Sequence, residues 1–468
     1  MKFIFTLLLI FVSTKSLIAQ TNVAGGIYQN TTWTVANSPY IMTGSMVVFP
    51  GVTLTIEPGV IIKVTPDYSF NTGNFRYLEI RGSLIAIGTD ANPIIFTTDE
   101  ATPFQTQTWH GINIKGSQGG NVQMDRFHLE RSWYGIYNDI TQPGVSYNWT
   151  NCHFKNNNYA VQLNADMVYQ GCLFQENGVG QAAQISYGSL TANNCQFIDN
   201  FCSFTWSNFI SVSNSLFQGN GNNIVGSPGM ISNCQFINND FGITEGFGHT
   251  IQNCLFQGNG IAVENTGSCN IDNCSFENNN IAVKLGDNSI LTNNSINNNE
   301  VGVAVLAYSP NSTLIENNTI CYNTEFNLQN LTDKNFQVNA NCFCSQDSSY
   351  IENLILDGYD DITKGLVNYA IFDDSCSNIL DYIVKINLDG GVGITELNNG
   401  AWKLKGQDAD FIYIENHNAL YLELYNALGQ LEANFSLAKG YNRISINQMP
   451  SGIYFLKNQN GRTQKVII

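Results

Sequence analysis

The chain has 468 residues, only 12% of them charged, and its 20 basic against 37 acidic side chains give a net charge of −17. This excess of negative charge repels phosphate backbones and anionic lipids, so nucleic acid is excluded as a partner. The length is too great for one ordinary globular domain and predicts several domains unless an internal repeat accounts for it.

The N-terminus has the composition of a signal peptide. Met1 and Lys2 are followed by an apolar run over residues 3–12 and by a short stretch that ends at Ala19. The run is shorter than the roughly 18 to 20 apolar residues that a membrane-spanning helix needs, and no other segment approaches that length. We therefore expect residues 1–19 to be a cleaved signal peptide, no transmembrane segment, and a mature protein that is secreted or held at the outer cell surface.

A repeat dominates residues 146–345. The pattern Asn-Cys-x-Phe-x-x-Asn recurs with a period near twenty residues, and its nine apolar centres are Phe154, Phe174, Phe197, Phe217, Phe236, Phe256, Phe276, Ile296 and Ile320. Two further apolar positions recur around the centres, one five residues before and one seven after. A period of this length without helical spacing predicts a solenoid with three short strands in each coil. We expect residues 20–145 to form an N-terminal cap and the first coils.

Asparagine marks two positions of the repeat. It stands three residues after all nine centres, from Asn157 to Asn323, and three residues before eight of them, with Gly171 as the exception. Asn tolerates the left-handed backbone region, and stacked side-chain amides can hydrogen-bond to one another along the axis of a solenoid. We therefore expect both positions to be tight corners of the coil.

Cysteine recurs two residues before six of the centres, at Cys152, Cys172, Cys195, Cys234, Cys254 and Cys274. Strand alternation places these side chains inside with the Phe centres. Because in-register parallel neighbours direct their sulfur atoms the same way, we expect a buried ladder of free thiols. Disulfide bonds are expected instead among Cys321, Cys342, Cys344 and Cys376, near the end of the repeat.

These ladders, together with the segments 51–59, 77–84 and 109–112, resemble the pectin-lyase-like superfamily of secreted bacterial β-helix proteins. The resemblance covers roughly residues 30 to 345 and implies an all-β, right-handed parallel β-helix with three strands in each coil. It also implies that a lyase or hydrolase site, if present, lies on the outward side of one strand face.

Residues 346–394 are expected to form a C-terminal cap and a linker. Asp357, Asp360 and Asp361 cluster in this segment. Ca²⁺ bound through hard oxygen ligands is one interpretation, and aspartates that belong to turns of the cap are the other. No further cofactor is expected.

From residue 395 the repeat gives way to strand alternation. The segments 421–430, 450–456 and 465–468 resemble the C-terminal sorting domain of the type IX secretion system, without its usual Pro-Asn-Pro opening. The resemblance implies that residues 395–468 form a small β-sandwich-like domain. It also implies that the type IX machinery carries the chain across an outer membrane of the Bacteroidota type, for release or attachment to surface polysaccharide. An ordinary carbohydrate-binding β module is the alternative.

Charged and aromatic residues concentrate upstream of the regular coils. A β-eliminating lyase needs a base beside a cation, and His153 with Lys155 is the nearest approach to such a pair. A second group could line a ligand groove: Asp125, Arg126, His128, Glu130, Arg131, Trp133, Tyr134 and Tyr137. The residues that flank the other centres are expected to face outward and are almost uncharged, so no catalytic residue is assigned. Glu264 and Lys284 share one register and are expected to form an ion pair.

Three functions remain open. The flat, nearly uncharged outer face favours a non-catalytic binding or adhesive rod that recognises a glycan or a protein at the cell exterior. The alternatives are a polysaccharide-active enzyme, either a lyase or a glycoside hydrolase, and a passive structural spacer. The enzyme requires charged groups from distant coils to converge in one groove, whereas the spacer requires no concave surface at all.

Overall fold

The computed structural model describes residues 20–66, 76–98, 108–140, 145–178, 181–184, 188–205, 207–307 and 312–372, and between 402 and 467 the strands given below with a few adjoining residues. The chain divides into two compact units, residues 1–392 and 393–468. The expected signal peptide, residues 1–19, lies outside the described residues.

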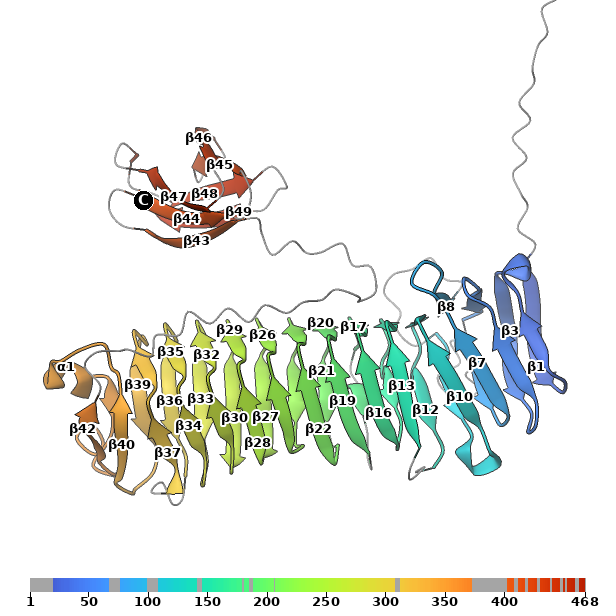
Figure 1. The fold of residues 1–468 in the computed structure, drawn as a ribbon, viewed down its shortest axis with the longest axis horizontal. Helices are drawn as coiled ribbons and strands as arrows, with labels where there is room; N and C mark the ends of the chain where they lie inside the picture. Colours follow the sequence, from blue (N-terminus) through green and yellow to red (C-terminus); the bar gives the residue numbers. More distant parts are fainter. Residues whose placement is uncertain are drawn as a thin grey trace, which may run out of the picture. The chain divides into compact units, whose positions relative to one another are not determined.

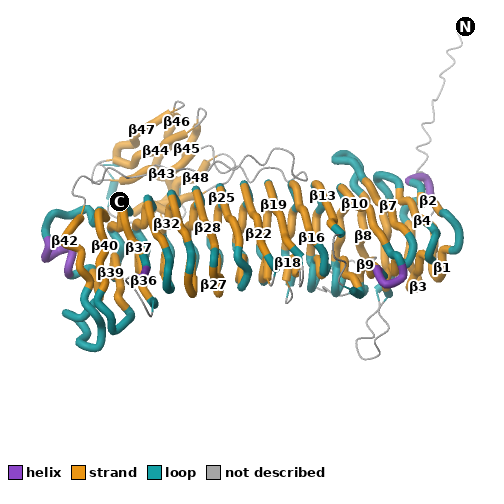
Figure 2. Tube along the Cα trace, turned by 60° about the horizontal axis from the view of Figure 1, so that its bottom comes forward, coloured by secondary structure: helices purple, strands orange, loops and turns teal. Residues whose placement is uncertain are grey.

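The first unit is a β-helix, which confirms the predicted fold. Figures 1 and 2 show the strands of successive coils stacked along one axis, and neighbouring coils pair in parallel with Phe opposite Phe. Each regular coil contributes one strand to each of three faces, because three apolar positions per coil point inward and the residues between them turn the chain.

The three faces are defined by their strands. Face 1 consists of β2 (Thr31–Trp33), β4 (Thr53–Ile56), β7 (Ser83–Ile87), β10 (Asn121–Asp125), β13 (Ser146–Thr150), β16 (Asp166–Gln170), β19 (Ser189–Asn193), β22 (Phe209–Ser213), β25 (Gly229–Ser232), β28 (His249–Gln252), β31 (Asn270–Asp272), β34 (Ile290–Thr292), β37 (Leu314–Glu316), β40 (Phe336–Asn341) and β42 (Val367–Phe372). Face 2 consists of β5 (Ile61–Val64), β8 (Ile94–Thr98), β11 (Phe127–Glu130), β14 (His153–Lys155), β17 (Leu173–Gln175), β20 (Gln196–Ile198), β23 (Leu216–Gln218), β26 (Gln235–Ile237), β29 (Leu255–Gln257), β32 (Ser275–Glu277), β35 (Ser295–Asn297) and β38 (Thr319–Cys321). Face 3 consists of β6 (Tyr77–Ile80), β9 (Gly111–Ile114), β12 (Ile136–Asn138), β15 (Val161–Gln162), β18 (Gln181–Gln184), β21 (Cys202–Thr205), β24 (Asn222–Val225), β27 (Phe241–Phe247), β30 (Ile261–Gly267), β33 (Ile281–Leu285), β36 (Val301–Val305), β39 (Phe326–Asn330) and β41 (Ile355–Leu356).

The two ends of the β-helix depart from this order. At the N-terminal end, β1 (Thr21–Ile27) pairs with β3 (Tyr40–Val48), and β3 pairs in turn with β5 and β6. Two short 3₁₀ helices, Val35–Asn37 and Gly116–Gln118, lie in corners. At the other end, helix α1 (Ser348–Glu352) precedes β41, and its fully buried Ile351 joins the apolar core. This segment covers the last coil, as a solenoid end requires.

Phenylalanine rings stack through the interior. Between Phe154 and Phe276, the centroids of rings in neighbouring coils lie 4.6 to 4.9 Å apart with interplanar angles of 1° to 10°. Every ring in this stack is fully buried. Burial of each ring stabilises the fold by roughly 1.5–3 kcal/mol, so the stack is a major part of what holds the coils in register.

The invariant Asn after each centre lies inside the coil, which corrects the prediction that it forms a corner. Asn239 is typical: its Nδ2 donates to the Phe217 carbonyl at 3.1 Å and to Asn259 Oδ1 at 2.9 Å. The left-handed residue is the one before it, such as Asn238 with φ 54°. A buried amide needs partners for its donors and acceptor, and the ladder of amides supplies them.

The corner before each centre is as predicted. The eight Asn residues at that position have φ between 51° and 58°, and Gly171, the exception in sequence, has φ 64°. Asn and Gly adopt this conformation at the lowest cost, which explains why the position admits both.

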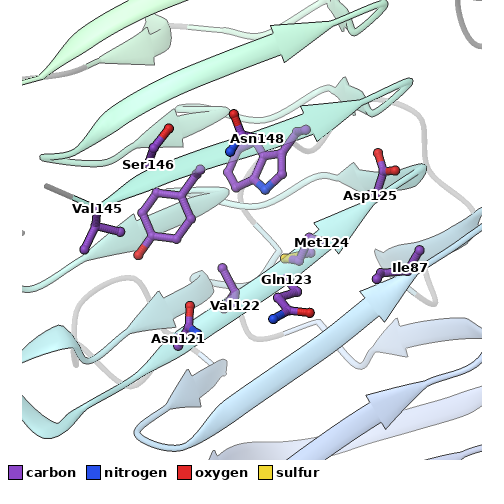
Figure 3. Close-up of a pocket in the computed structure, with 11 residues that line it drawn as sticks. Ile87, Asn121, Val122, Gln123, Met124, Asp125, Val145, Ser146 and Asn148 are labelled. Carbon is purple, nitrogen blue, oxygen red and sulfur yellow. The ribbon is translucent and has the colours of Figure 1, made fainter.

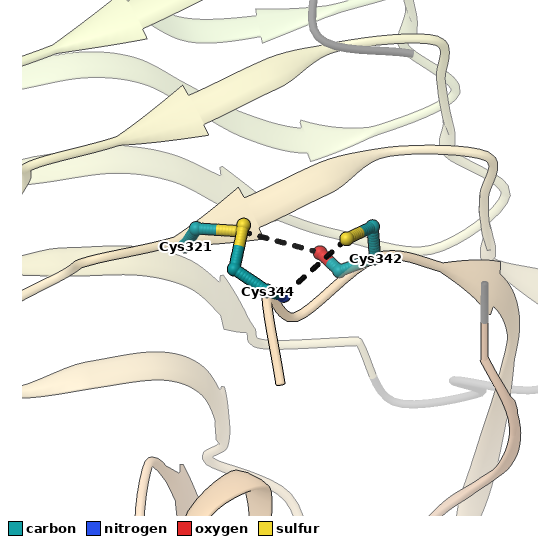
Figure 4. Close-up of side chains that lie close together, drawn as sticks. All are labelled: Cys321, Cys342 and Cys344. Atoms are coloured by element: carbon teal, nitrogen blue, oxygen red, sulfur yellow. Dashed lines mark hydrogen bonds between the residues drawn. A yellow bond between two sulfur atoms is a disulfide. The ribbon is translucent and has the colours of Figure 1, made fainter. Parts of the chain in front are cut away.

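Eight cysteines are free and buried, and they include the six of the predicted thiol ladder. The backbone N–H of Cys234 donates to Cys254 Sγ at 3.5 Å. Near the end of the repeat, Cys321 and Cys344 form a disulfide with a Cα–Cα distance of 5.7 Å (Figure 4), and Cys342 is also disulfide-bonded. Sulfur atoms in disulfides do not ligate metal as thiolates do, so the role of this cluster is to link the last coils covalently. Cys376 lies outside the described residues.

The second unit consists of two antiparallel sheets. One contains β43 (Trp402–Gln407), β44 (Phe411–Asn416) and β47 (Gly440–Ser445); the other contains β45 (Leu420–Asn426), β46 (Leu431–Leu437), β48 (Ile453–Asn458) and β49 (Thr463–Ile467). Buried residues from both sheets form one core, which includes Ile414, Leu424 and Leu456. The unit therefore has the β-sandwich-like form that was predicted.

Candidate functional site

The predicted site residues lie in the coils that contain β11 and β14, on the outward side of face 2 and at the next corner. In the register of these strands, His128 is opposite His153 and Glu130 is opposite Lys155. The structure therefore brings these four residues together. Arg126 lies at a different corner, between β10 and β11, with φ 45°.

The charged groups of this region are paired. Lys155 Nζ lies 3.7 Å from Glu176 Oε2 in the following coil, and Glu130 Oε2 accepts a hydrogen bond from Thr97 Oγ1 at 3.0 Å. Arg126 Nε donates to Asp90 Oδ1 at 2.7 Å. Thr97 and Asp90 were not anticipated from sequence because they lie in coils outside the regular alignment. Glu176 lies in the next regular coil, one position beyond the register partner of Lys155, and was also not anticipated. The paired charges leave little net field for capturing an ionic ligand.

The two histidines of face 2 are poorly suited to acid–base chemistry. Their rings meet edge to face with centroids 5.2 Å apart, and neither Nε2 has a hydrogen-bond partner among the described residues. Burial is the main cause that lowers the pKa of His128, and burial followed by the charges of His128 and Lys155 lowers the pKa of His153 to about 3. An imidazole with such a pKa is a weak base near neutral pH.

An aromatic column stands at the corner between faces 2 and 3. His110, Tyr134 and Tyr159 occupy equivalent places in three successive coils, because the Tyr134 N–H donates to the His110 carbonyl at 2.9 Å and the Tyr159 N–H donates to the Trp133 carbonyl at 2.8 Å. The Tyr134 and Tyr159 rings stack with centroids 5.4 Å apart at 15°, and the His110 ring meets Tyr134 edge to face at 5.0 Å. All of these side chains are half-buried.

Tyr137 adds a fourth aromatic ring beside this column. Its ring lies 5.3 Å from Tyr134, and its hydroxyl is hydrogen-bonded to His110 Nδ1 at 2.6 Å. Burial raises the pKa of Tyr137 and lowers the pKa of His110. Both groups are therefore neutral near pH 7, and the tautomer of the imidazole decides which of the two donates. Asn113, the register neighbour of Tyr137, has no hydrogen-bond partner for its Oδ1 among the described residues.

Trp133, Tyr134 and Tyr137 were expected from the sequence to line a groove, whereas His110 and Tyr159 were missed. Trp133 packs at the edge of the column, with its centroid 6.2 Å from that of Tyr134. Arg131, with φ 59°, turns the chain just before it. A signal was present in the sequence: the segments 109–112, 133–136 and 158–161 read Trp-His-Gly-Ile, Trp-Tyr-Gly-Ile and Asn-Tyr-Ala-Val. Each segment places an aromatic residue before a small residue and then a β-branched one.

The outer side of face 2 in the regular coils is less exposed than predicted. Ser275, Ser295, Thr319 and Cys321 flank their centres but are buried, and Cys321 is buried in the disulfide. The predicted ion pair is present on face 3, with Lys284 Nζ 3.2 Å from Glu264 Oε1.

The acidic residues of the cap serve its turns. Asp357 is fully buried; its Oδ1 accepts from the Tyr359 N–H and its Oδ2 from the Val367 N–H, both at 2.8 Å. Asp361 Oδ1 accepts from the Thr363 N–H at 2.9 Å, and Asp360 Oδ2 accepts from the Asp357 N–H at 3.3 Å. This geometry is that of aspartates in turns, and calcium binding stays an untested prediction.

Two segments of the chain match known protein families. Residues 25–132 match the pectate-lyase like beta helix domain, and residues 408–468 match the secretion system C-terminal sorting domain. Among solved structures, the chain is similar to a mannuronic acid specific polysaccharide family 6 lyase from human gut microbiota, with 11% identity and a TM-score of 0.28 over 69% of this chain and 85% of that one. It is also similar to tailspike protein 3 of bacteriophage CBA120, with 9% identity and a TM-score of 0.30 over 75% of this chain and 56% of that one. No curated protein matches the chain.

One of the two family matches concerns the location of the protein. The sorting domain indicates secretion with attachment to the cell surface and handling by the type IX secretion machinery, as predicted. Within the described part of the chain, no helix is both long and apolar enough to cross a membrane.

Proposed function

We propose that this chain, which joins a pectate-lyase-like β-helix domain to a secretion sorting domain, is a non-catalytic rod that binds glycan at the cell exterior. The observation that carries the proposal is the aromatic column formed by His110, Tyr134 and Tyr159, with Tyr137 beside it. A sugar ring has an apolar face of C–H groups that packs on an aromatic ring, while its hydroxyls bond to polar groups at the rim.

The column suits a polymer because it repeats along the axis of the β-helix. Successive coils are about 4.8 Å apart, so three coils offer an extended strip of rings and not a single contact. The neighbouring charges are engaged in pairs such as Lys155 with Glu176, which favours a ligand of low charge.

The test is binding of the mature protein to a glycan array, followed by titration of the best ligand with the Tyr134→Ala variant. We expect affinity to fall about tenfold or more, because the central ring of the column is lost. The matched control is Tyr359→Ala, which removes a ring that is 77% exposed in a turn of the cap. The proposal fails if Tyr134→Ala, shown to be folded by circular dichroism, binds the glycan as tightly as the control does.

The second candidate is a polysaccharide-active enzyme, and the hydrogen bond between His110 and Tyr137 favours it. A neutral imidazole and a protonated phenol could act as base and acid on a bound chain. Incubation with polysaccharides and assay for new reducing ends or unsaturated uronates would identify cleavage, and Tyr137→Phe should abolish it while leaving the column in place. Absence of both binding and cleavage on every glycan would favour the passive spacer.

A further inference from the structure

Face 1 is interrupted at one level of the β-helix. Faces 2 and 3 continue through this level, since β11 pairs with both β8 and β14, and β12 pairs with both β9 and β15. On face 1, β10 pairs with β7 and β13 pairs with β16, but among the described strands no ladder joins β10 to β13. Two neighbouring coils therefore separate on one face only.

The gap between β10 and β13 is closed at one end. Asp125 Oδ1 accepts from the Thr150 N–H at 2.8 Å, and the Arg126 N–H donates to the Thr150 carbonyl at 3.0 Å. Asp125 Oδ2 in turn accepts from Arg126 Nη1 at 2.5 Å. The Asp125 carboxylate thus takes the place of a ladder hydrogen bond, and the two strands cannot separate further at this end.

The rest of the gap is a pocket of about 250 Å³ between the two strands, shown in Figure 3. Its inner wall consists of apolar and aromatic side chains that are 5% exposed or less: Val122, Met124, Tyr147 and Trp149. Its rim consists of exposed, uncharged polar side chains: Asn121, Gln123, Ser146 and Asn148. The carboxylate in the lining, that of Asp125, already accepts from the Thr150 N–H and from Arg126 Nη1. These contacts at the closed end are called the Asp125 clip here.

We propose that this pocket, called the wedge here, binds the terminal sugar of a neutral glycan. Amides and a hydroxyl at the rim can donate to and accept from vicinal hydroxyls, and the accessible apolar side chains of the lining, Ile87 and Val145, can contact the C–H groups of a sugar ring. The absence of a free charge in its lining disfavours an acidic sugar. Because the Asp125 clip closes one end, the wedge admits the end of a chain and not its middle.

An added peptide strand fits the wedge less well than a sugar does. A strand inserted between β10 and β13 would need about 4.8 Å on each side along its whole length. The Asp125–Thr150 contact holds the two strands together at one end, so such a spacing is not available there. The wedge is also separate from the aromatic column, which lies at the corner between the other two faces.

The test uses the mature protein and a rim variant that carries Gln123→Ala and Asn148→Ala, both at exposed positions. Isothermal titration with neutral gluco-, xylo- and manno-oligosaccharides, and with oligouronates as the acidic counterpart, should give neutral-sugar binding that weakens about tenfold in the rim variant. The matched control is Thr191→Ala, another exposed polar side chain on face 1. The titration is repeated in the Tyr134→Ala background, which removes the contribution of the column, and there the rim substitutions should again weaken neutral-sugar binding about tenfold.

Each outcome decides the inference. It is overturned if the rim variant binds every neutral oligosaccharide as tightly as the control, or if oligouronates bind the wedge as well as neutral sugars do. It is also overturned if blocking both ends of the oligosaccharide leaves binding intact. Loss of all neutral-sugar binding in Tyr134→Ala would support the column and overturn the wedge, whereas binding that persists in Tyr134→Ala and is lost when the rim substitutions are added supports the wedge.

Discussion

His249 should make the β-helix sensitive to acid. It lies in β28 with its side chain 1% exposed, and neither ring nitrogen has a hydrogen-bond partner in the described part of the chain. The ring packs directly on Gly246, where an added Cβ would come within 2.0 Å of its Nε2. Burial lowers the pKa of His249 to about 4.

The sign and size of the change in unfolding free energy with pH follow from the linkage between protonation and folding. The unfolded chain binds a proton at this side chain below about pH 6.5, whereas the folded chain does so only below about pH 4. The stability that the neutral imidazole supports is therefore complete above pH 6.5 and is lost as the pH falls toward 4. A difference of roughly 2.5 pKa units corresponds to about 3 kcal/mol.

The assay is urea unfolding of the mature protein at pH 7.5 and at pH 4, followed by circular dichroism. In His249→Gln, the difference in unfolding free energy between the two pH values should be smaller than in the wild type by about 3 kcal/mol, whatever the stability of the variant at pH 7.5. Thr250→Ala, the next residue along the strand, carries no titrating group and should keep the wild-type difference. If His249→Gln and the wild type lose the same stability on acidification, the reasoning is wrong.

Three further predictions concern the amide ladder, the terminal disulfide and the ion pair on face 3. Asn239→Ala should lower the free energy of unfolding by about 2–4 kcal/mol in urea, since the Phe217 carbonyl and the Asn220 N–H lose buried partners, and a loss under about 1 kcal/mol would contradict this. Cys344→Ser should cost about 3 kcal/mol, because its disulfide spans 23 residues, and equal thermal unfolding of variant and oxidised wild type would refute it. The double variant Glu264→Gln, Lys284→Met should change stability by less than about 1 kcal/mol, because both side chains are partly exposed; a larger loss would mean that the pair contributes more than surface pairs do.

The regular coils could be predicted from sequence because three features indicate the same structure: the period near twenty residues, the alternation of inward and outward positions, and the residue types at those positions. Residue type alone could not distinguish the corner from the ladder, since in several coils both positions are Asn, as at Asn238 and Asn239. The distinguishing signal lies in the other coils, where the position before the invariant Asn is Gly219 or Gly258. Glycine at one position and unvarying Asn at the next indicate a left-handed corner followed by a buried amide.

The candidate site was only partly predictable. Its charged residues were found by composition, but two features hid their partners. Thr97, the partner of Glu130, lies in an irregular coil, and Glu176 lies one position beyond the register partner of Lys155. The aromatic column spans intervals of 24 and 25 residues, outside the period near twenty of the later coils. The wedge could not be predicted at all, because it arises from the failure of two strands to pair, and no residue type encodes that failure.

The ladder of buried amides allows the β-helix to be lengthened by whole coils. Each regular coil presents the same Asn and Phe to the coil on either side, so a duplicated stretch such as residues 234–253 would find both neighbours already suited to it. One duplication would move the aromatic column and the terminal disulfide apart by about 4.8 Å without altering either. Tandem duplication can therefore adjust the length of the β-helix in equal steps.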